Sequence, residues 1–459
     1  MQPETLPSPR ARRLPAWAFW AALATATPAW AADWIEYVDQ SNARISAAAE
    51  VGLGDVEEKD LVVGDVDRDG DSDLVVLRKT PFSNPGGRRN VLFLNESGVM
   101  VDRSSVLAPD FLDATDDRDG VLVDVDGDGW LDLVTAGTFG EKPRVVMNLG
   151  DDSGGAWLGF DYEPAAGRLP GFSPTPNFCS VAAGDVSGDG KPDLYFTDYD
   201  TTLEDRLLIN DGHGFFSDQT TQRLAPAMVF SAFALDSQIA DMNGDGFNDI
   251  VKDNASGSAP PPGSSPEVAV LYNDGTGHFN FKDPVYTAAP YAAEVADFTQ
   301  DGKLDLFVVD DGQDRYLINT GNDGQGHANF SSHAVATSPQ TSFFGGGAHF
   351  ADLDNDGILD VTVADVDADI PGCDRRMALL RGQGTPPNIA YADPLAGASR
   401  PWLLSGAFDI AALHIDDDGV LDLWVGTCSG NRVFMGRTQT LFRDGFESGT
   451  AAAWDLVVP

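Results

Sequence analysis

The stretch DVDGDGWLD, residues 124–132, has aspartates at alternate positions and a glycine at its sixth position. Variants of this nine-residue pattern also begin at residues 65, 185, 241, 297, 352 and 414, so consecutive copies start 55 to 62 residues apart. Self-similarity at a regular period is typical of repeat architectures. We therefore interpret residues 32–437 as seven copies of one structural unit.

Each acidic loop lies in the same order of short apolar runs. In the first repeat one run precedes the loop (Leu61–Val63), one follows it directly (Leu74–Leu77), and a third ends in asparagine (Val91–Asn95). A Gly-rich turn and a Phe-containing run complete several of the repeats. Such runs, bounded by Gly, Asn and Asp, indicate β-strands joined by tight turns. Seven repeats of four strands predict an all-β fold, a seven-bladed β-propeller with four-stranded antiparallel blades.

Closure of the ring needs a partner for its first or last strand, because an open ring leaves unpaired strand edges. Trp34–Asp39 precedes the first loop and resembles the fourth strand of other repeats. We expect this N-terminal strand to pair beside Arg432–Met435 in the last blade. Thr440–Arg443 is a rival for the same position.

The acidic loops have the composition of a calcium site. Hard divalent cations favour oxygen ligands, and a glycine allows the backbone to turn sharply around them. Zinc or copper would call for His or Cys clusters. Solvated Asp-rich turns without a metal are the alternative, which we disfavour because carboxylates this close repel one another. We predict up to seven structural Ca²⁺ ions, with positions 1, 3, 5 and 9 supplying side-chain oxygens and position 7 its carbonyl.

The candidate ligands occupy the same five positions of each loop. They are Asp65, Asp124, Asp185, Asp241, Asp297 and Asp352 at position 1; Asp67, Asp126, Ser187, Asn243, Thr299, Asp354 and Asp416 at position 3; Asp69, Asp128, Asp189, Asp245, Asp301, Asp356 and Asp418 at position 5; Asp71, Trp130, Lys191, Phe247, Lys303, Ile358 and Val420 at position 7; and Asp73, Asp132, Asp193, Asp249, Asp305, Asp360 and Asp422 at position 9.

The seven loops are not equivalent. The loops that begin at Asp65, Asp124 and Asp352 have carboxylates at all four side-chain positions, so we expect them to bind calcium most tightly. In the loops that begin at Asp185, Asp241 and Asp297, a neutral side-chain oxygen replaces one of the four carboxylates. His414 replaces the first aspartate of the seventh loop, and an imidazole is a poor calcium ligand. We expect that loop to be the weakest.

The overall charge excludes some classes of partner. The 459 residues include 72 Asp plus Glu against 29 Lys plus Arg, which gives a formal net charge of −43. Nucleic acids and anionic membrane surfaces attract basic proteins, so neither is an expected partner. Hydrophobic residues make up 42% of the chain, which is enough to build packed cores.

The N-terminus has the order of a cleavable export signal. Arg10, Arg12 and Arg13 precede an apolar stretch (Leu14–Pro28) and the small-x-small sequence that ends at Ala31. A membrane anchor is the weaker alternative, because a spanning helix needs about 20 apolar residues. We expect a signal peptide (1–31), a propeller (32–437), a C-terminal tail (438–459), and an exported protein that is secreted, periplasmic or on the cell surface.

The three cysteines permit at most one disulfide bond. Cys373 and Cys428 belong to neighbouring repeats and are the favoured pair, whereas Cys179 lies in an apolar run and is expected to be a small buried residue.

The repeated loops and their strand order resemble the FG-GAP and VCBS repeat families and the calcium-binding blades of integrin α-subunit propellers. The resemblance covers roughly residues 34–437. It implies a seven-bladed propeller, one calcium ion per intact loop, an extracellular setting, and adhesion or ligand binding rather than catalysis. Ser187, Asn243, Thr299 and His414 depart from the family pattern.

Two functions fit this sequence. The favoured one is a monomeric binding or adhesion module for an extracellular protein or glycan, with no catalytic residues assigned. The alternative is a carbohydrate-active enzyme, a polysaccharide lyase or hydrolase, on a propeller scaffold.

Variable connections are where a ligand is expected to bind, because function concentrates in loops on a rigid scaffold. Residues 81–89, 151–177 and 259–266 are predicted to lie on the face opposite the acidic loops, although the Pro-rich 259–266 equally fits a stiff spacer. Four arginines recur at one register, where they either grip an acidic ligand or, as we favour, neutralise nearby aspartates; they are Arg144, Arg206, Arg315 and Arg432.

Overall fold

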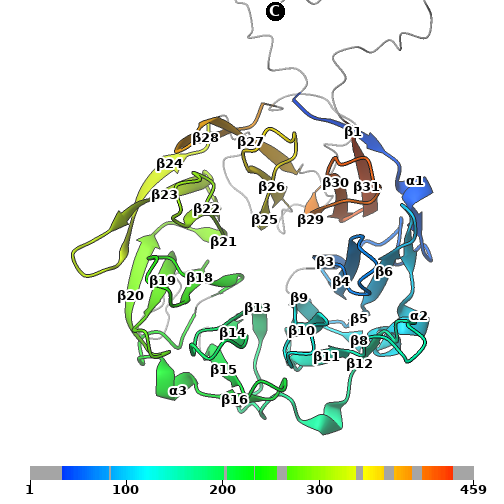
Figure 1. Cartoon of the computed structure of the whole chain (residues 1–459), viewed down its shortest axis with the longest axis horizontal. Helices are drawn as coiled ribbons and strands as arrows, with labels where there is room; N and C mark the ends of the chain where they lie inside the picture. Colours follow the sequence, from blue (N-terminus) through cyan, green and yellow to red (C-terminus); the bar gives the residue numbers. More distant parts are fainter. Residues whose placement is uncertain are drawn as a thin grey trace, which may run out of the picture.

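The computed structural model describes residues 34–81, 84–200, 204–231, 233–255, 266–336, 345–365, 377–394 and 406–437. Seven sheets surround a common axis, and the innermost strand of each faces that axis (Figure 1). Within each blade consecutive strands pair antiparallel. The seven-bladed propeller predicted from the repeats is therefore confirmed.

The strands of each blade follow one another from the axis outward. Blade 1 contains β3 (Glu58–Gly64), β4 (Asp73–Lys79), β6 (Val91–Asn95) and β7 (Met100–Asp102), with β2 (Ile45–Ser46) added in parallel at its outer edge. Blade 2 contains β9 (Asp117–Val123), β10 (Asp132–Gly137), β11 (Arg144–Asn148) and β12 (Phe160–Asp161). Blade 3 contains β13 (Phe178–Gly184), β14 (Asp193–Asp198), β15 (Arg206–Asn210) and β16 (Phe216–Asp218). Blade 4 contains β17 (Ser237–Ala240), β18 (Asp249–Asn254), β19 (Glu267–Asn273) and β20 (Phe279–Tyr286).

The remaining blades have the same order. Blade 5 contains β21 (Pro290–Ala296), β22 (Asp305–Asp310), β23 (Arg315–Asn322) and β24 (Ala328–Ala334). Blade 6 contains β25 (Gly345–Ala351), β26 (Asp360–Asp365), β27 (Ala378–Thr385) and β28 (Asn388–Ala392). Blade 7 contains β29 (Ala407–Leu413), β30 (Asp422–Thr427), β31 (Gly430–Arg437) and β1 (Glu36–Asp39). Outside the blades lie a two-stranded sheet, β5 (Arg88–Arg89) with β8 (Ala114–Thr115), and the short helices α1 (Ser41–Arg44), α2 (Ser104–Leu107), η1 (Pro109–Leu112), η2 (Pro164–Ala166) and α3 (Thr220–Arg223).

The hydrophobic core lies between adjacent blades. Strands such as β4 are buried along their whole length because both of their faces are apolar and each face meets a neighbouring sheet. One buried cluster joins blades 1 and 2 through Leu77 and Leu133, and equivalent clusters join the other neighbouring pairs. This packing makes the ring a rigid scaffold for its loops.

The N-terminal strand closes the ring. β1 pairs antiparallel with β31, with Val38 opposite Met435 and Asp39 opposite Phe434. The predicted pairing is confirmed, and the rival segment Thr440–Arg443 lies outside the described residues. Trp34, Ile35 and Tyr37 are buried in the core between blades 6 and 7.

A recurrent cap follows the outermost strand. In blade 7 the Oδ1 atom of Asp39 accepts hydrogen bonds from the main-chain N–H and hydroxyl of Ser41, and the Ser41 hydroxyl accepts one from the N–H of Val433. Asp102 with Ser104 and Asp218 with Thr220 make the same contacts in blades 1 and 3. β1 is thus followed by the same cap as the fourth strands of blades 1 and 3, as expected for the fourth strand of blade 7.

Several sequence predictions concern other parts of the chain. The predicted signal peptide (1–31), most of the 259–266 run and the C-terminal tail lie outside the described residues. Cys179 is buried and free, and Cys428 is disulfide-bonded; its predicted partner, Cys373, lies outside the described residues. Within the described ranges, no helix is long and apolar enough to cross a membrane.

One predicted loop position is wrong in part. Residues 151–157 form the turn between β11 and β12, in which the N–H of Asp152 donates to the carbonyl of Ala156. Because strands alternate in direction, this turn lies on the same face as the acidic loops, and only the later part of 151–177 leads to the next blade. The prediction from the sequence was wrong here because β12, which separates this turn from the connection to blade 3, is only two residues long.

Candidate metal centres in the acidic loops

Every acidic loop joins the first and second strands of a blade, so all seven lie on one face of the ring. Position 6 is a glycine with positive φ in each, from 78° at Gly419 to 98° at Gly70. Only glycine adopts this conformation without strain, which explains why position 6 is glycine in all seven repeats. The tight turn brings the carboxylates of alternate positions to one side.

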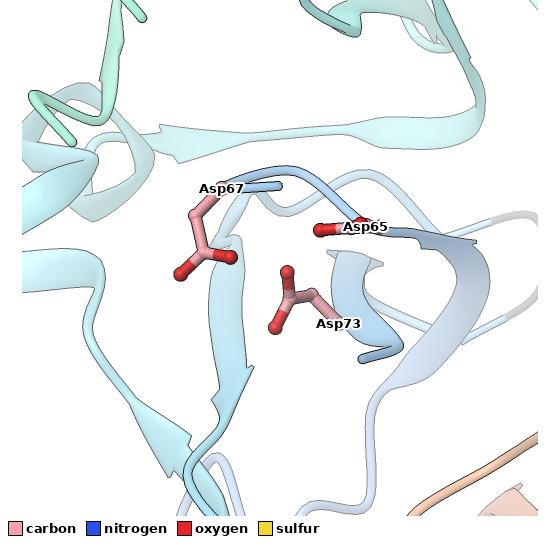
Figure 2. A group of neighbouring side chains, drawn as sticks. All are labelled: Asp65, Asp67 and Asp73. Atoms are coloured by element: carbon pink, nitrogen blue, oxygen red, sulfur yellow. The ribbon is translucent and has the colours of Figure 1, made fainter. Parts of the chain in front are cut away.

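The blade 1 loop brings three predicted ligands together. Oxygen atoms of Asp65, Asp67 and Asp73 all lie within 4.8 Å of one another, and Figure 2 shows the three carboxylates gathered beneath the loop. The Oδ1 atoms of Asp65 and Asp71 are buried and have no hydrogen-bond partner among the described residues. Buried carboxylate oxygens without partners are costly unless a cation satisfies them. The donor set of blade 1 therefore fits a hard cation such as Ca²⁺.

Two other loops bring three carboxylates equally close. These groups are Asp124, Asp126 and Asp132 in blade 2, and Asp352, Asp354 and Asp356 in blade 6. They belong to the same three loops that the sequence predicts to bind calcium most tightly. In blade 6 the third carboxylate comes from position 5 instead of position 9.

The aspartate at position 9 holds the loop to its blade. In blade 2, Asp132 accepts hydrogen bonds from the N–H groups of Val125 (3.1 Å) and Asn148 (2.8 Å). Position 9 makes corresponding bonds in the other blades. Burial raises the pKa of this carboxyl, to about 7 for Asp132 and about 8 for Asp73. Position 9 is therefore a structural element of the blade as well as a candidate ligand.

The aspartate at position 1 caps the loop in blades 2 to 6. Its Oδ2 accepts a hydrogen bond from the position 6 glycine, as Asp124 does from Gly129 at 2.8 Å. Asp65 makes no such bond within the described chain, and its Oδ1 is buried without a hydrogen-bond partner. Blade 1 thus has the position 1 carboxylate that is freest to bind a cation.

Neutral residues at position 3 make contacts inside their own loops. The Ser187 hydroxyl lies 3.4 Å from Asp185, the Asn243 amide donates to Asp245 at 3.0 Å, and the Thr299 hydroxyl donates to Asp305 at 2.9 Å. These oxygens and amides replace a carboxylate that would otherwise need a cation. The weaker affinity expected for blades 3 to 5 stays a prediction.

Two side chains bind polar groups of the blade 7 loop, one from the loop itself and one from α1. The Nδ1 atom of His414 lies 3.2 Å from the carbonyl oxygen of Val420, to which it donates in the tautomer with a proton on Nδ1. The Arg44 guanidinium binds Asp416 at 2.8 Å and also donates to the carbonyl of Gly98. An imidazole and a guanidinium therefore contact the position 7 carbonyl and the position 3 carboxylate.

Position 7 side chains point away from the carboxylates in most loops. The Trp130 ring lies 4.3 Å from the Arg68 guanidinium of the neighbouring loop, and Phe247 is 40% exposed. Ile358 packs against the core between blades 5 and 6, Val420 is buried, and Lys303 forms an ion pair with Asp301. Only Asp71 adds a carboxylate to its loop, and burial together with the charge of Asp69 raises its pKa to about 7.

An asparagine at the end of the third strand joins neighbouring loops, a role that sequence reasoning missed. In blade 2 the Asn148 amide donates to the position 2 carbonyl of the preceding loop (Val66, 2.8 Å) and to its own position 8 carbonyl (Leu131, 3.2 Å). Asn95, Asn210, Asn273 and Asn319 bind the preceding position 2 carbonyl in the same way. The sequence could have indicated this role, because the asparagine recurs at the end of the third strand in five repeats.

A second set of carboxylates, which sequence reasoning missed, lies on the innermost strands or directly before them. Aspartates stand five residues before the loop in four repeats: Asp60, Asp119, Asp236 and Asp409. Three of them accept a hydrogen bond from the next blade, such as Asp409 from the N–H of Leu61 at 2.9 Å. His349 of blade 6 lies 2.9 Å from Asp409, and Gln238 donates to Glu294 at 2.5 Å. Because first strands do not pair with one another, these side chains supply polar links between blades.

The recurrent arginines are engaged within the blades. Arg144 forms a buried ion pair with Asp117, Arg206 pairs with Glu204 and Asp218, and Arg432 donates to the carbonyls of Leu53 and Asn431. The favoured role, in which the arginine pairs with nearby carboxylates, is confirmed for Arg144 and Arg206, whereas Arg432 binds main-chain carbonyls instead.

Fold and loops together define a β-propeller with acidic loops between the first two strands of its blades. The FG-GAP-like repeat family matches residues 124–196, 185–251 and 297–363, which include the loops of blades 2 to 6. The chain therefore contains FG-GAP-like repeats, as its resemblance to that family predicted.

A solved structure has a similar fold. A lectin of Agrocybe aegerita, described as recognising non-reducing terminal N-acetylglucosamine, aligns with a TM-score of 0.50 and 16% sequence identity over 84% of this chain and 90% of that chain. At this identity the likeness concerns the fold alone. None of the curated proteins compared with the chain matches it in sequence.

Proposed function

We propose that this protein is an exported, calcium-binding β-propeller that acts as a rigid binding module for an extracellular protein or glycan. The observation that carries the calcium assignment is the blade 1 loop, where three carboxylates converge and two buried oxygens have no partner. Asp65, Asp67 and Asp73 would hold the ion in blade 1, and Asp124, Asp126 and Asp132 in blade 2. Bound calcium supplies positive charge that holds each turn between first and second strands.

Export and calcium binding support one another. The basic, apolar and small-residue order of residues 10–31 favours cleavage after Ala31. Calcium outside the cytosol is about millimolar, a concentration at which even modest extracellular sites are filled. N-terminal sequencing of the protein recovered from the exporting cell tests this step, and a retained Met1 would contradict it.

Melting with and without EGTA tests the calcium assignment. Ligands that bind only the folded state stabilise it by mass action, so chelation is expected to lower the melting temperature and added Ca²⁺ to restore it. Mg²⁺ is the matched control ion, because it prefers a smaller octahedral site that keeps several waters. An unchanged melting temperature in EGTA would remove calcium from the proposal.

A glycan is one of the ligand classes that we propose, because the Agrocybe aegerita lectin with a similar fold recognises a terminal sugar. Arrays of glycans and of extracellular-matrix proteins, probed with the calcium-loaded protein, are expected to give saturable binding to one class. Each hit is then incubated with the protein and its products are analysed. Release of cleaved polysaccharide would replace the binding module with a carbohydrate-active enzyme.

A further inference from the structure

The blade 6 loop contains a cation of its own. The Nη2 atom of Arg381 lies 2.7 Å from Asp354 and 3.1 Å from Asp356, the carboxylates at positions 3 and 5. Both belong to the group of three that converges in this loop, with Asp352 as the third. The guanidinium therefore binds two of the three carboxylates that a metal ion would use.

Arg381 is exceptional at its register. It lies on β27 directly before Gly382, whose N–H binds the position 9 carboxylate of Asp360 at 2.9 Å. The residue at this place is apolar or aromatic in every other blade: Leu94, Met147, Ile209, Tyr272, Ile318 and Met435. Among these seven positions, blade 6 alone directs a permanent positive charge at its acidic loop.

The surroundings hold the guanidinium in place. The Arg381 side chain is 26% exposed and that of Asp354 is 8% exposed, so this ion pair is largely shielded from water. The Trp34 ring lies 5.7 Å from the guanidinium carbon and packs in one cluster with Leu353 at position 2 of the same loop. A guanidinium that binds carboxylates and faces an aromatic ring is fixed more firmly than a solvated lysine.

We propose that Arg381 takes the place of calcium in blade 6, so this loop stays without metal at calcium concentrations that fill blades 1 and 2. The inference rests on the proposed calcium-binding function and refines it. It also reverses the expectation from the carboxylate pattern, which ranks blade 6 with the tightest loops. In blade 7, Arg44 binds Asp416 and takes the place of a metal ion in the same way.

Removal of the guanidinium should create a calcium site. In Arg381→Met, the converging Asp352, Asp354 and Asp356 lose their internal cation, and we expect the number of bound Ca²⁺ ions per chain to rise by one. Titration calorimetry and equilibrium dialysis of the full mature chain measure this number. Arg206→Met is the matched control, because Arg206 pairs with Glu204 and Asp218 away from any acidic loop; its calcium number should equal that of the wild type.

Two further variants separate the possible results. Asp352→Asn with Asp356→Asn in the otherwise unchanged chain should not lower the calcium number, whereas Asp65→Asn with Asp67→Asn should lower it by one. A loss of one ion in the blade 6 double variant, or no gain in a folded Arg381→Met protein, would overturn the inference. If the wild-type protein binds no calcium at all, the proposed calcium-binding function itself is wrong. That result is distinguishable from the two results that would overturn only the inference about blade 6.

Discussion

The acidic loops of blades 1 and 6 have the same four carboxylate positions but differ in what balances their charge. In blade 1 the Asp65 and Asp71 oxygens are buried without partners. In blade 6 an arginine from the adjacent strand binds two of the carboxylates. A ligand pattern in sequence therefore measures how much negative charge a loop has, whereas the neighbouring strand decides whether a cationic side chain reaches that charge.

The largest expected effect is one that both loops share. Asp73→Ala in blade 1 and Asp360→Ala in blade 6 each remove a buried carboxylate that accepts two main-chain hydrogen bonds. Leaving two buried N–H groups unsatisfied should lower the free energy of unfolding by about 3 to 5 kcal/mol in either blade. Urea unfolding in excess EGTA measures the loss without a contribution from metal. A loss below about 1 kcal/mol in one blade would show that position 9 is not a common structural element.

The second effect distinguishes the two loops. Asp65→Asn should reduce the part of the stability that EGTA removes, by about 2.7 kcal/mol if calcium is present at 100 times its dissociation constant. Asp352→Asn should leave that part unchanged, because Arg381 already binds Asp354 and Asp356 of that loop. Melting each variant with and without EGTA provides the comparison. Equal losses in both would mean that blade 6 also binds calcium.

The third effect concerns the link between neighbouring loops. Asn148→Ala removes two hydrogen bonds, to Val66 and Leu131, and should cost about 1 to 3 kcal/mol. Blade 6 has Gly382 at the corresponding place, and the Tyr391 hydroxyl donates to the Leu359 carbonyl instead, at 3.0 Å.

Transplanting the asparagine into blade 6 provides the reverse test. Gly382→Asn should destabilise the blade, because a Cβ atom there would collide with the Leu359 carbonyl. Urea unfolding of both variants measures the two costs. Neutral behaviour of Gly382→Asn would mean that blade 6 can adopt the arrangement of the other blades.

The smallest effect lies at the axis, where no acidic loop takes part. Burial alone would lower the pKa of the His349 imidazole. The charge and hydrogen bond of Asp409 outweigh burial, together with the charges of Glu294 and Asp60, and raise this pKa to about 10. The folded state then binds this proton more tightly than the unfolded state, so the contribution is full below about pH 6.5 and is lost as the pH rises toward about 10. Solvent screening reduces the effect, because 43% of the His349 side chain is exposed.

A substitution isolates that contribution. His349→Asn should be less stable than the wild type near about pH 6, and the difference should shrink as the pH approaches about 10. Urea unfolding in EGTA across this range measures it. A difference that stays constant with pH would mean that the His349–Asp409 contact is not an ion pair.

Much of the fold was predictable from the sequence because the same order of acidic loop and apolar runs recurs seven times. The register of β4 and its equivalents follows from the fixed distance between the acidic loop and the next apolar run, and closure by β1 follows from the need to cover a strand edge. The site was predictable only within each loop. Arg381 and Arg44 reach their carboxylates from 25 residues and 372 residues away, respectively. No local pattern contains such contacts, and they depend on how the strands pack.

The pairing of β1 with β31 sets the order of events during synthesis. Its partners Glu36 and Arg437 are about 400 residues apart, and closing a chain segment of that length costs roughly 5 kcal/mol in chain entropy. β1, the first strand of the described residues, therefore pairs only after β31 has been made, and blade 7 presents an open edge until then. A ribosome that stalls before β31 leaves that edge available to another copy of the chain. Vulnerability to aggregation should accordingly be greatest in nascent chains that lack only their final hairpin.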